Sequence, residues 1–100
     1  MTRERLLQHL SDQLPYLRLR YGINRLGLFG SYARAEQTET SDIDLIYELN
    51  DGISMGLFQV MDLEEYLKNK LEIRQIDLVN ARWMNPIIAH EVRKEVIYVS

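Results

Sequence analysis

The sequence predicts an α/β domain of the α+β kind, in which a small mixed β-sheet is flanked by helices. Three observations support this fold class. Leucines recur at helical spacing near the start, short apolar or alternating runs follow at three later places, and an Asn-Pro pair opens a final helical segment. The 100 residues are enough for one modest core, so we expect residues 1–100 to form a single domain.

The first expected element is an amphipathic helix over residues 2–21. Thr2 can cap its start and Gly22 its end. Pro15 should kink or break the helix near residues 11–14, because proline lacks the N–H that an interior turn needs. The apolar residues that set the helical spacing are Leu6, Leu7, Leu10, Leu14 and Leu17.

Two strands are expected next, separated by a turn and a polar loop. Residues 24–29 read NRLGLF and form a short strand that ends at Gly30. Residues 31–35 suit one helical turn with Ser31 as its cap. The strand over residues 42–49 alternates cleanly, with its apolar side chains on one face and mostly acidic side chains on the other.

The second half of the chain predicts a helix, a strand, a helix and an edge strand. The helix covers roughly residues 55–70, and the strand covers residues 73–79 with Asp77 inside it. The last helix runs from Asn85-Pro86 to about Arg93, and residues 96–99 add an edge strand. The apolar positions that indicate the first of these helices are Leu57, Val60, Met61, Leu67 and Leu71.

The composition excludes several classes of protein. A net charge of −3 argues against a general nucleic-acid binder, which needs a basic face. Without cysteine there is no disulfide framework and no thiolate metal site. No apolar run approaches the roughly 20 residues that cross a bilayer, and the charged start is unlike a signal peptide. We therefore expect a cytoplasmic protein without membrane contact.

The acidic residues are unevenly distributed along the chain. Residues 35–58 contain no Lys or Arg and six acids, which are Glu36, Glu39, Asp42, Asp44, Glu48 and Asp51. By charge alone this stretch suits a solvated acidic edge. The other interpretation is a site whose missing counter-charge is a metal ion.

Three aspartates are the candidate metal ligands. Asp42 and Asp44 are two apart on a strand and so point to the same face, with Cα atoms roughly 6.6 Å apart. A cation would relieve their mutual repulsion. Asp77 lies inside an otherwise apolar strand, where an unpaired charge is unfavourable. If the two strands are neighbours, three carboxylates share one face and favour Mg²⁺ or Mn²⁺.

Gly30 and Ser31 are the candidate phosphate-binding residues. Glycine lets the backbone approach a phosphate closely, and the N–H groups that open a helical turn bind anions. The serine adds a hydroxyl donor. A strand end that holds phosphate beside carboxylates that hold metal is the two-metal arrangement for attack on phosphorus.

The pattern Gly30-Ser31, ten residues, Asp42-x-Asp44 resembles the signature of the nucleotidyltransferase superfamily related to DNA polymerase β. The segment LGLFGSYARAEQTETSDIDL is similar to the minimal nucleotidyltransferases in particular, and the likeness covers nearly the whole chain. It implies that Asp42 and Asp44 are paired metal ligands, that Asp77 is the third carboxylate, and that Gly30-Ser31 contacts phosphate. Ala35 stands where the family usually has a glycine. If that position needs a positive φ, alanine costs on the order of 1 kcal/mol.

The resemblance implies a metal-dependent transfer of AMP from ATP to a hydroxyl group. Minimal nucleotidyltransferases often act as antitoxins that modify a tyrosine of a HEPN-type ribonuclease toxin. Two alternatives stay open: a non-catalytic antitoxin that covers its partner, and a small-molecule transferase of the aminoglycoside type. The acceptor, the nucleobase preference and the oligomeric state are not given by the sequence.

Other polar and aromatic residues have ordinary interpretations beside functional ones. Arg34 either contacts phosphate or pairs with Glu36 or Glu39. Tyr32 suits packing rather than chemistry, and His9 and His90 suit surface or interface positions on helices. A cluster near the last helix forms either core or an exposed patch for a partner, and it comprises Trp83, Met84, Ile87 and Ile88.

Overall fold

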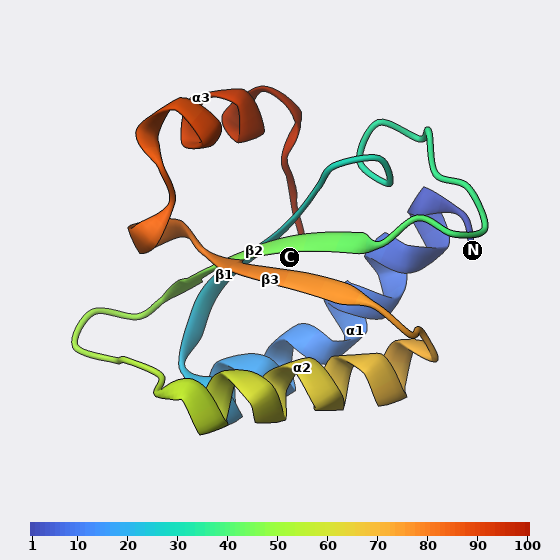
Figure 1. Cartoon of the computed structure of the whole chain (residues 1–100). Helices are drawn as coiled ribbons and strands as arrows, with labels where there is room; N and C mark the ends of the chain where they lie inside the picture. Colours follow the sequence, from blue (N-terminus) through green and yellow to red (C-terminus); the bar gives the residue numbers. More distant parts are fainter.

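A computed structural model, which describes all of residues 1–100, shows three helices and one four-stranded mixed sheet. The expected order of helices and strands is confirmed, with one short 3₁₀ helix added. The elements are α1 (Arg3–Tyr21), β1 (Ile23–Phe29), β2 (Ile43–Leu49), α2 (Leu57–Leu71), β3 (Ile76–Asn80), η1 (Ala81–Trp83), α3 (Pro86–Glu95) and β4 (Ile97–Tyr98). Helices α1 and α2 lie against one face of the sheet, and α3 stands over the other (Figure 1).

The sheet has the strand order β3-β2-β1-β4. β1 pairs antiparallel with both β2 and β4, so the short last strand is an edge strand, as expected. β2 and β3 pair in parallel, and α2 makes the crossover between them. The register of this parallel pair places Asp44 opposite Asp77. The two strands that carry the aspartates are therefore direct neighbours.

Helix α1 runs without interruption through Pro15, so the expected break near residues 11–14 does not occur. Thr2 caps its start and Gly22, in the left-handed conformation, ends it, as the sequence predicts. Pro15 faces solvent, while Leu14 and Leu17 on either side are fully buried. Burying such side chains contributes roughly 1.5–3 kcal/mol each, which offsets the roughly 3 kcal/mol that an interior proline costs.

The core lies between the sheet and helices α1 and α2, and no polar or charged residue is buried. Helix α2 faces the core with Leu63, Leu67 and Leu71. Leu57 and Met61, which the sequence analysis used to indicate the helix, are exposed instead. Leu57 and Met61 are four residues apart, as expected for one side of a helix. They lie on a different side from the buried leucines, which are also spaced four apart.

Helix α3 covers the opposite face only partly. Val92 is its one buried residue, whereas Ile87 and Ile88 are exposed. The sheet is therefore closed on one face and open to solvent over part of the other. None of the helices is both long and apolar enough to pass through a membrane.

Candidate active site

The open face of the sheet carries two of the three candidate carboxylates side by side. Asp44 and Asp77 are register partners on parallel strands, so their side chains leave the sheet on the same face. Asp77 is exposed and Asp44 is half-buried. The expectation that Asp77 shares a face with Asp44 is confirmed.

The electrostatics of Asp44 reflect this placement. The pKa of its carboxyl group is raised to about 6, first by burial and next by the negative charge of Asp77. A hydrogen bond with Asp77 and the charge of Asp42 contribute as well. The site thus holds more negative charge than its environment stabilises, which favours a bound cation or a bound proton.

Asp42 lies just before β2 and is exposed. Its charge acts on Asp44, but Asp42, Asp44 and Asp77 do not come close enough together to form a group of three that could hold a metal ion. The structure therefore brings together one pair of the predicted ligands and leaves Asp42 beside it. The donor set itself, carboxylate oxygens alone, fits a hard divalent cation such as Mg²⁺ or Mn²⁺.

Gly30 lies directly against the Asp44 carboxylate. A Cβ atom at position 30 would clash with Asp44 Oδ2, so a side chain there would have to displace this carboxylate. Its φ of +77° is in the left-handed region that glycine adopts without strain. The turn that follows β1 and the carboxylate of β2 therefore form one site, as the spacing of Gly-Ser and Asp-x-Asp indicates.

The backbone of this turn offers free donors. Its hydrogen bonds run from the N–H groups of residues 34, 35 and 36 to the carbonyls of Gly30, Tyr32 and Ser31, at 3.2, 3.2 and 2.8 Å respectively. The N–H groups of residues 31–33 are donors in none of these bonds. Free N–H groups at the start of a helical turn attract anions, which suits a phosphate beside the carboxylates.

Ala35 ends the turn with a φ of +57°. The position therefore does need a positive φ, and an alanine occupies it at a cost on the order of 1 kcal/mol. Arg34 is held beside it by two ion pairs, to Glu36 at 2.7 Å and to Glu95 at 2.6 Å. Of the two roles left open for Arg34, the structure shows ion pairing: Glu36 is one of the partners that the sequence offers, and Glu95 at the end of α3 is an additional partner.

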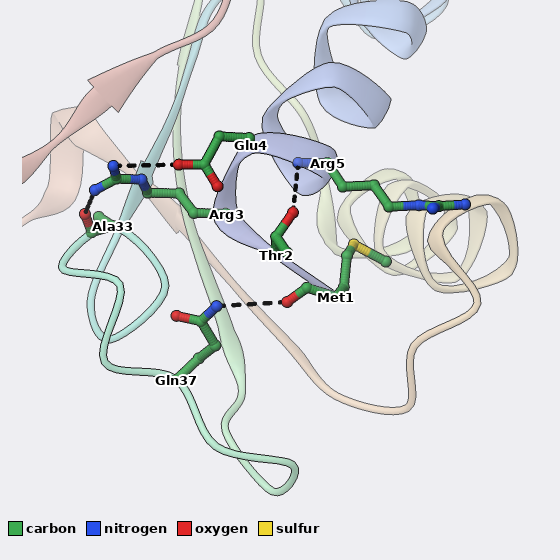
Figure 2. A network of polar contacts seen from close by, with 7 residues as sticks. All are labelled: Met1, Thr2, Arg3, Glu4, Arg5, Ala33 and Gln37. Carbon is green, nitrogen blue, oxygen red and sulfur yellow. Dashed lines mark hydrogen bonds and ion pairs between the residues drawn. The ribbon is translucent and has the colours of Figure 1, made fainter.

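The start of α1 fixes the far side of the same turn (Figure 2). Arg3 Nη1 donates to the carbonyl of Ala33 at 3.0 Å, and Gln37 Nε2 donates to the carbonyl of Met1 at 3.4 Å. Tyr32 is buried in the core, which confirms its packing role. The turn is therefore held by α1, by α3 and by the core, while its N–H groups remain available.

Two cavities open on this face of the sheet. The smaller, of about 420 Å³, contains both Asp44 and Asp77. Its other lining residues include Phe29, Met84, Asn85 and Ile88. The larger, of about 730 Å³, lies toward the other ends of β2 and β3, where Glu48, Asn80 and Arg82 are among its lining residues. Met84 lines both cavities, so they adjoin.

The sequence analysis missed the contribution of α3 to the carboxylate cavity. Asn85, which the sequence places at the start of the last helix, caps this helix by accepting a hydrogen bond from the N–H of Ile87 at 2.8 Å. No local signal predicts that the start of α3 folds over Asp77. His9 and His90 take no part in the site, since neither lines this cavity.

A mixed sheet whose strand carboxylates adjoin a Gly-Ser turn with free N–H groups suits an enzyme that acts on phosphate groups. A comparison with family models identifies the class further. Residues 14–100 match the family described as "Polymerase beta, Nucleotidyltransferase". The chain therefore belongs to the polymerase beta nucleotidyltransferase family, and it is a nucleotidyltransferase.

Individual relatives agree with this family. The protein adenylyltransferase MntA of Thermococcus cleftensis is 37% identical over 99 residues, which cover 99% of this chain and 97% of the relative. A solved structure that is provisionally described as a minimal nucleotidyltransferase has a TM-score of 0.78 and 31% identity, covering 97% of this chain and 95% of the other.

Two more distant structures share the fold. One is a toxin–antitoxin complex with AMP-PNP, with a TM-score of 0.71, 22% identity, and coverage of 88% of this chain and 70% of the other. Another contains a tri-AMPylated HEPN toxin from Shewanella oneidensis with its MNT antitoxin, with a TM-score of 0.65, 20% identity, and coverage of 92% and 70%.

Proposed function

We propose that this nucleotidyltransferase transfers AMP from ATP to a hydroxyl group of a HEPN-type toxin, and that it acts as the antitoxin of that partner. The observation that carries the proposal is the contact between Gly30 and the Asp44 carboxylate, with Asp77 alongside. This contact joins a phosphate-binding turn to a carboxylate pair in one site.

Each part of the site has a separate task. The free N–H groups that follow Gly30, together with the Ser31 hydroxyl, bind the terminal phosphates of ATP. Asp44 and Asp77, with Asp42 beside them, would hold Mg²⁺ or Mn²⁺. When bound, such an ion stabilises negative charge on the phosphates and lowers the pKa of the acceptor hydroxyl.

The reaction is a substitution at the α-phosphorus of ATP. The acceptor oxygen forms a bond to that phosphorus while the bond to the bridging oxygen of pyrophosphate breaks. The hydroxyl proton passes to Asp77, the exposed member of the carboxylate pair. The products are an adenylylated partner and pyrophosphate.

Two similarities support a protein as the acceptor. The relative from Thermococcus cleftensis is named a protein adenylyltransferase, and it matches this chain over nearly its whole length. Structures with the same fold come from toxin–antitoxin complexes, one of which contains an AMPylated HEPN toxin. We infer that the acceptor is a tyrosine of the corresponding toxin.

The test compares the wild type with a variant that carries Asp42→Asn and Asp44→Asn. Both proteins are incubated with labelled ATP, Mg²⁺ and the HEPN-type toxin of the same organism, and intact mass is measured. We expect the wild type to add adenylate mass to the toxin. The variant should lose at least about a thousandfold in rate, because charge stabilisation of several kcal/mol is removed.

The same experiment distinguishes the enzyme from a protein that neutralises its partner by contact alone. Asparagine keeps the volume of aspartate, so the variant should fold as the wild type does and keep the apolar part of its contact with the toxin. If both proteins neutralise the toxin equally and neither adds mass, the transferase proposal is wrong. A pure binding function would then explain the pairing.

A further inference from the structure

An apolar surface lies beside the carboxylate cavity on the open face of the sheet. We call it the η1–α3 patch, and it consists of Trp83, Ile87 and Ile88, which are 76%, 75% and 53% exposed. Both elements stand on the side of the sheet that α1 and α2 leave uncovered (Figure 1). Large apolar side chains gathered in this way mark a contact surface for another protein.

The patch is continuous with the carboxylate cavity. Ile88 belongs to the patch and also lines the cavity that contains Asp44 and Asp77. A protein acceptor must bring its hydroxyl group to these carboxylates, and so it must cover the rim that Ile88 forms. The rest of the patch then lies directly under the acceptor.

The charges around the cavity indicate what kind of acceptor surface fits. Asp42, Asp44 and Asp77 form no ion pair within the protein. Arg34 beside the turn is neutralised by its two glutamates. Arg82 in η1 forms no ion pair, and its guanidinium lies 5.2 Å from the centre of the Trp83 ring, on the patch and not among the carboxylates. An acceptor with Lys or Arg around its hydroxyl side chain would complement this surplus of negative charge.

A second exposed apolar group lies on the other side of the molecule. Leu57 and Phe58, at the start of α2, are 71% and 83% exposed. They belong to the helix layer beneath the sheet, and they line neither of the two cavities. An acceptor bound there would not reach Asp77.

We propose that the acceptor protein docks on the η1–α3 patch, and that its docking face is apolar at the centre and basic around the reacting hydroxyl. This inference rests on the proposed function, because it assumes that the acceptor is a protein. It adds the surface that selects the acceptor.

The test uses two matched double variants. One carries Trp83→Ser and Ile87→Ser; the other carries Leu57→Ser and Phe58→Ser, which are exposed to a similar degree on the opposite layer. Ile87 and Phe58 are both the second residue of their helices, so serine affects the two helices alike. The dissociation constant for the HEPN-type toxin is measured by calorimetry without ATP, so that binding is independent of transfer.

We expect the first variant to weaken toxin binding at least about tenfold, because aromatic and apolar anchors dominate such interfaces. The second should bind within about twofold of the wild type. The rise in melting temperature with Mg²⁺ and ATP should be the same in all three proteins, which shows that the nucleotide site is intact. Binding should also weaken as salt rises from about 0.05 to about 0.5 M.

Equal toxin binding by the wild type and the Trp83→Ser, Ile87→Ser variant would overturn the docking site, as would a larger loss in the α2 variant. Affinity that does not change with salt would overturn the basic face. Failure of the proposed function gives a different result, since the wild type would then add no AMP whatever the dissociation constants are.

Discussion

The two faces of the sheet differ in what they contain. The face under α1 and α2 is apolar throughout, with Leu26, Leu28, Ile43 and Leu45 almost completely buried and no polar residue among them. The face under α3 carries Asp44 and Asp77, two adjoining cavities and exposed apolar side chains. Alternate residues of β2 supply both.

This difference shows that strand alternation separates stability from chemistry. Each strand contributes every second side chain to a closed core and the others to an open site. Neighbouring residues of β2 should therefore respond to substitution in unrelated ways. The predictions below test how complete this separation is.

The largest expected contrast is between substitutions of Leu45 and Asp44, which are adjacent in β2: one should change stability and the other the transfer rate. Leu45→Ala should lower the free energy of unfolding by about 2–5 kcal/mol, because Leu45 is fully buried. Its transfer rate per folded molecule should equal that of the wild type. Asp44→Asn should not lower the stability, and it should lose about a thousandfold in rate. Urea unfolding and intact-mass assays measure the two effects.

A folded Leu45→Ala protein with no transfer activity would show that the two faces are coupled. Leu28→Ala serves as a second core variant, since Leu28 is also fully buried. It should behave as Leu45→Ala does.

The stabilisation of the folded protein by ligands should depend only on residues of the open face. Mg²⁺ and ATP together should raise the melting midpoint by on the order of 10 °C at about a hundred times the dissociation constant, because they bind only the folded state. Asp44→Asn should lose this rise, whereas Leu45→Ala should keep it from a lower starting point. The measurement is a thermal melt monitored by circular dichroism. An equal rise in wild type and Asp44→Asn would mean that the metal binds elsewhere.

The pH dependence of stability should report on Asp44. Its pKa is about 6 in the folded protein and 3.8 in the reference state, so the folded state binds the proton more tightly. Stability is therefore greatest below the lower value and falls as the pH rises through this window. Because Asp44 is partly open to solvent, we expect a loss of about 1 kcal/mol.

The measurement is urea unfolding at several pH values without divalent ions. The difference between wild type and Asp44→Asn isolates this carboxyl group from all others. If the free energy of unfolding changes with pH in the same way in the two proteins, the raised pKa of Asp44 is contradicted.

The smallest effect concerns the turn beside the site. Ala35→Gly should raise the free energy of unfolding by up to about 1 kcal/mol, since glycine adopts a φ of +57° without strain. Gly30→Ala should have the opposite effect and lower the free energy of unfolding, because its Cβ would clash with Asp44 Oδ2. Chemical unfolding checks the first change. No gain from Ala35→Gly would show that the turn relieves the strain in another way.

Local patterns predicted much of the fold and part of the site. The alternation over residues 42–49 placed Asp44 on the face opposite the core, and the spacing from Gly30 placed the turn beside it. Both depend on short stretches of backbone whose geometry follows directly from sequence. The sequence left open whether position 35 needs a positive φ, and the structure shows that it does.

The errors and omissions all involve contacts between distant segments. The break expected at Pro15 ignored the burial of Leu14 and Leu17 against the sheet. The pair between Arg34 and Glu95 joins residues that are 61 positions apart. The lining of the carboxylate cavity by Ile88 depends on how α3 packs, which no spacing within the helix encodes.

The parallel pairing of β2 with β3 also determines when the active site can exist. Asp44 and Asp77 are 33 positions apart in sequence, and they meet only after α2 has carried the chain across the sheet. Such a closure is slower than the antiparallel pairing of β1 with β2. On the ribosome, the turn that follows β1 should therefore form beside Asp44 before β3 has paired with β2 and placed Asp77 there. A nascent chain in which β3 has not yet paired with β2 therefore lacks the carboxylate pair that we propose for transfer.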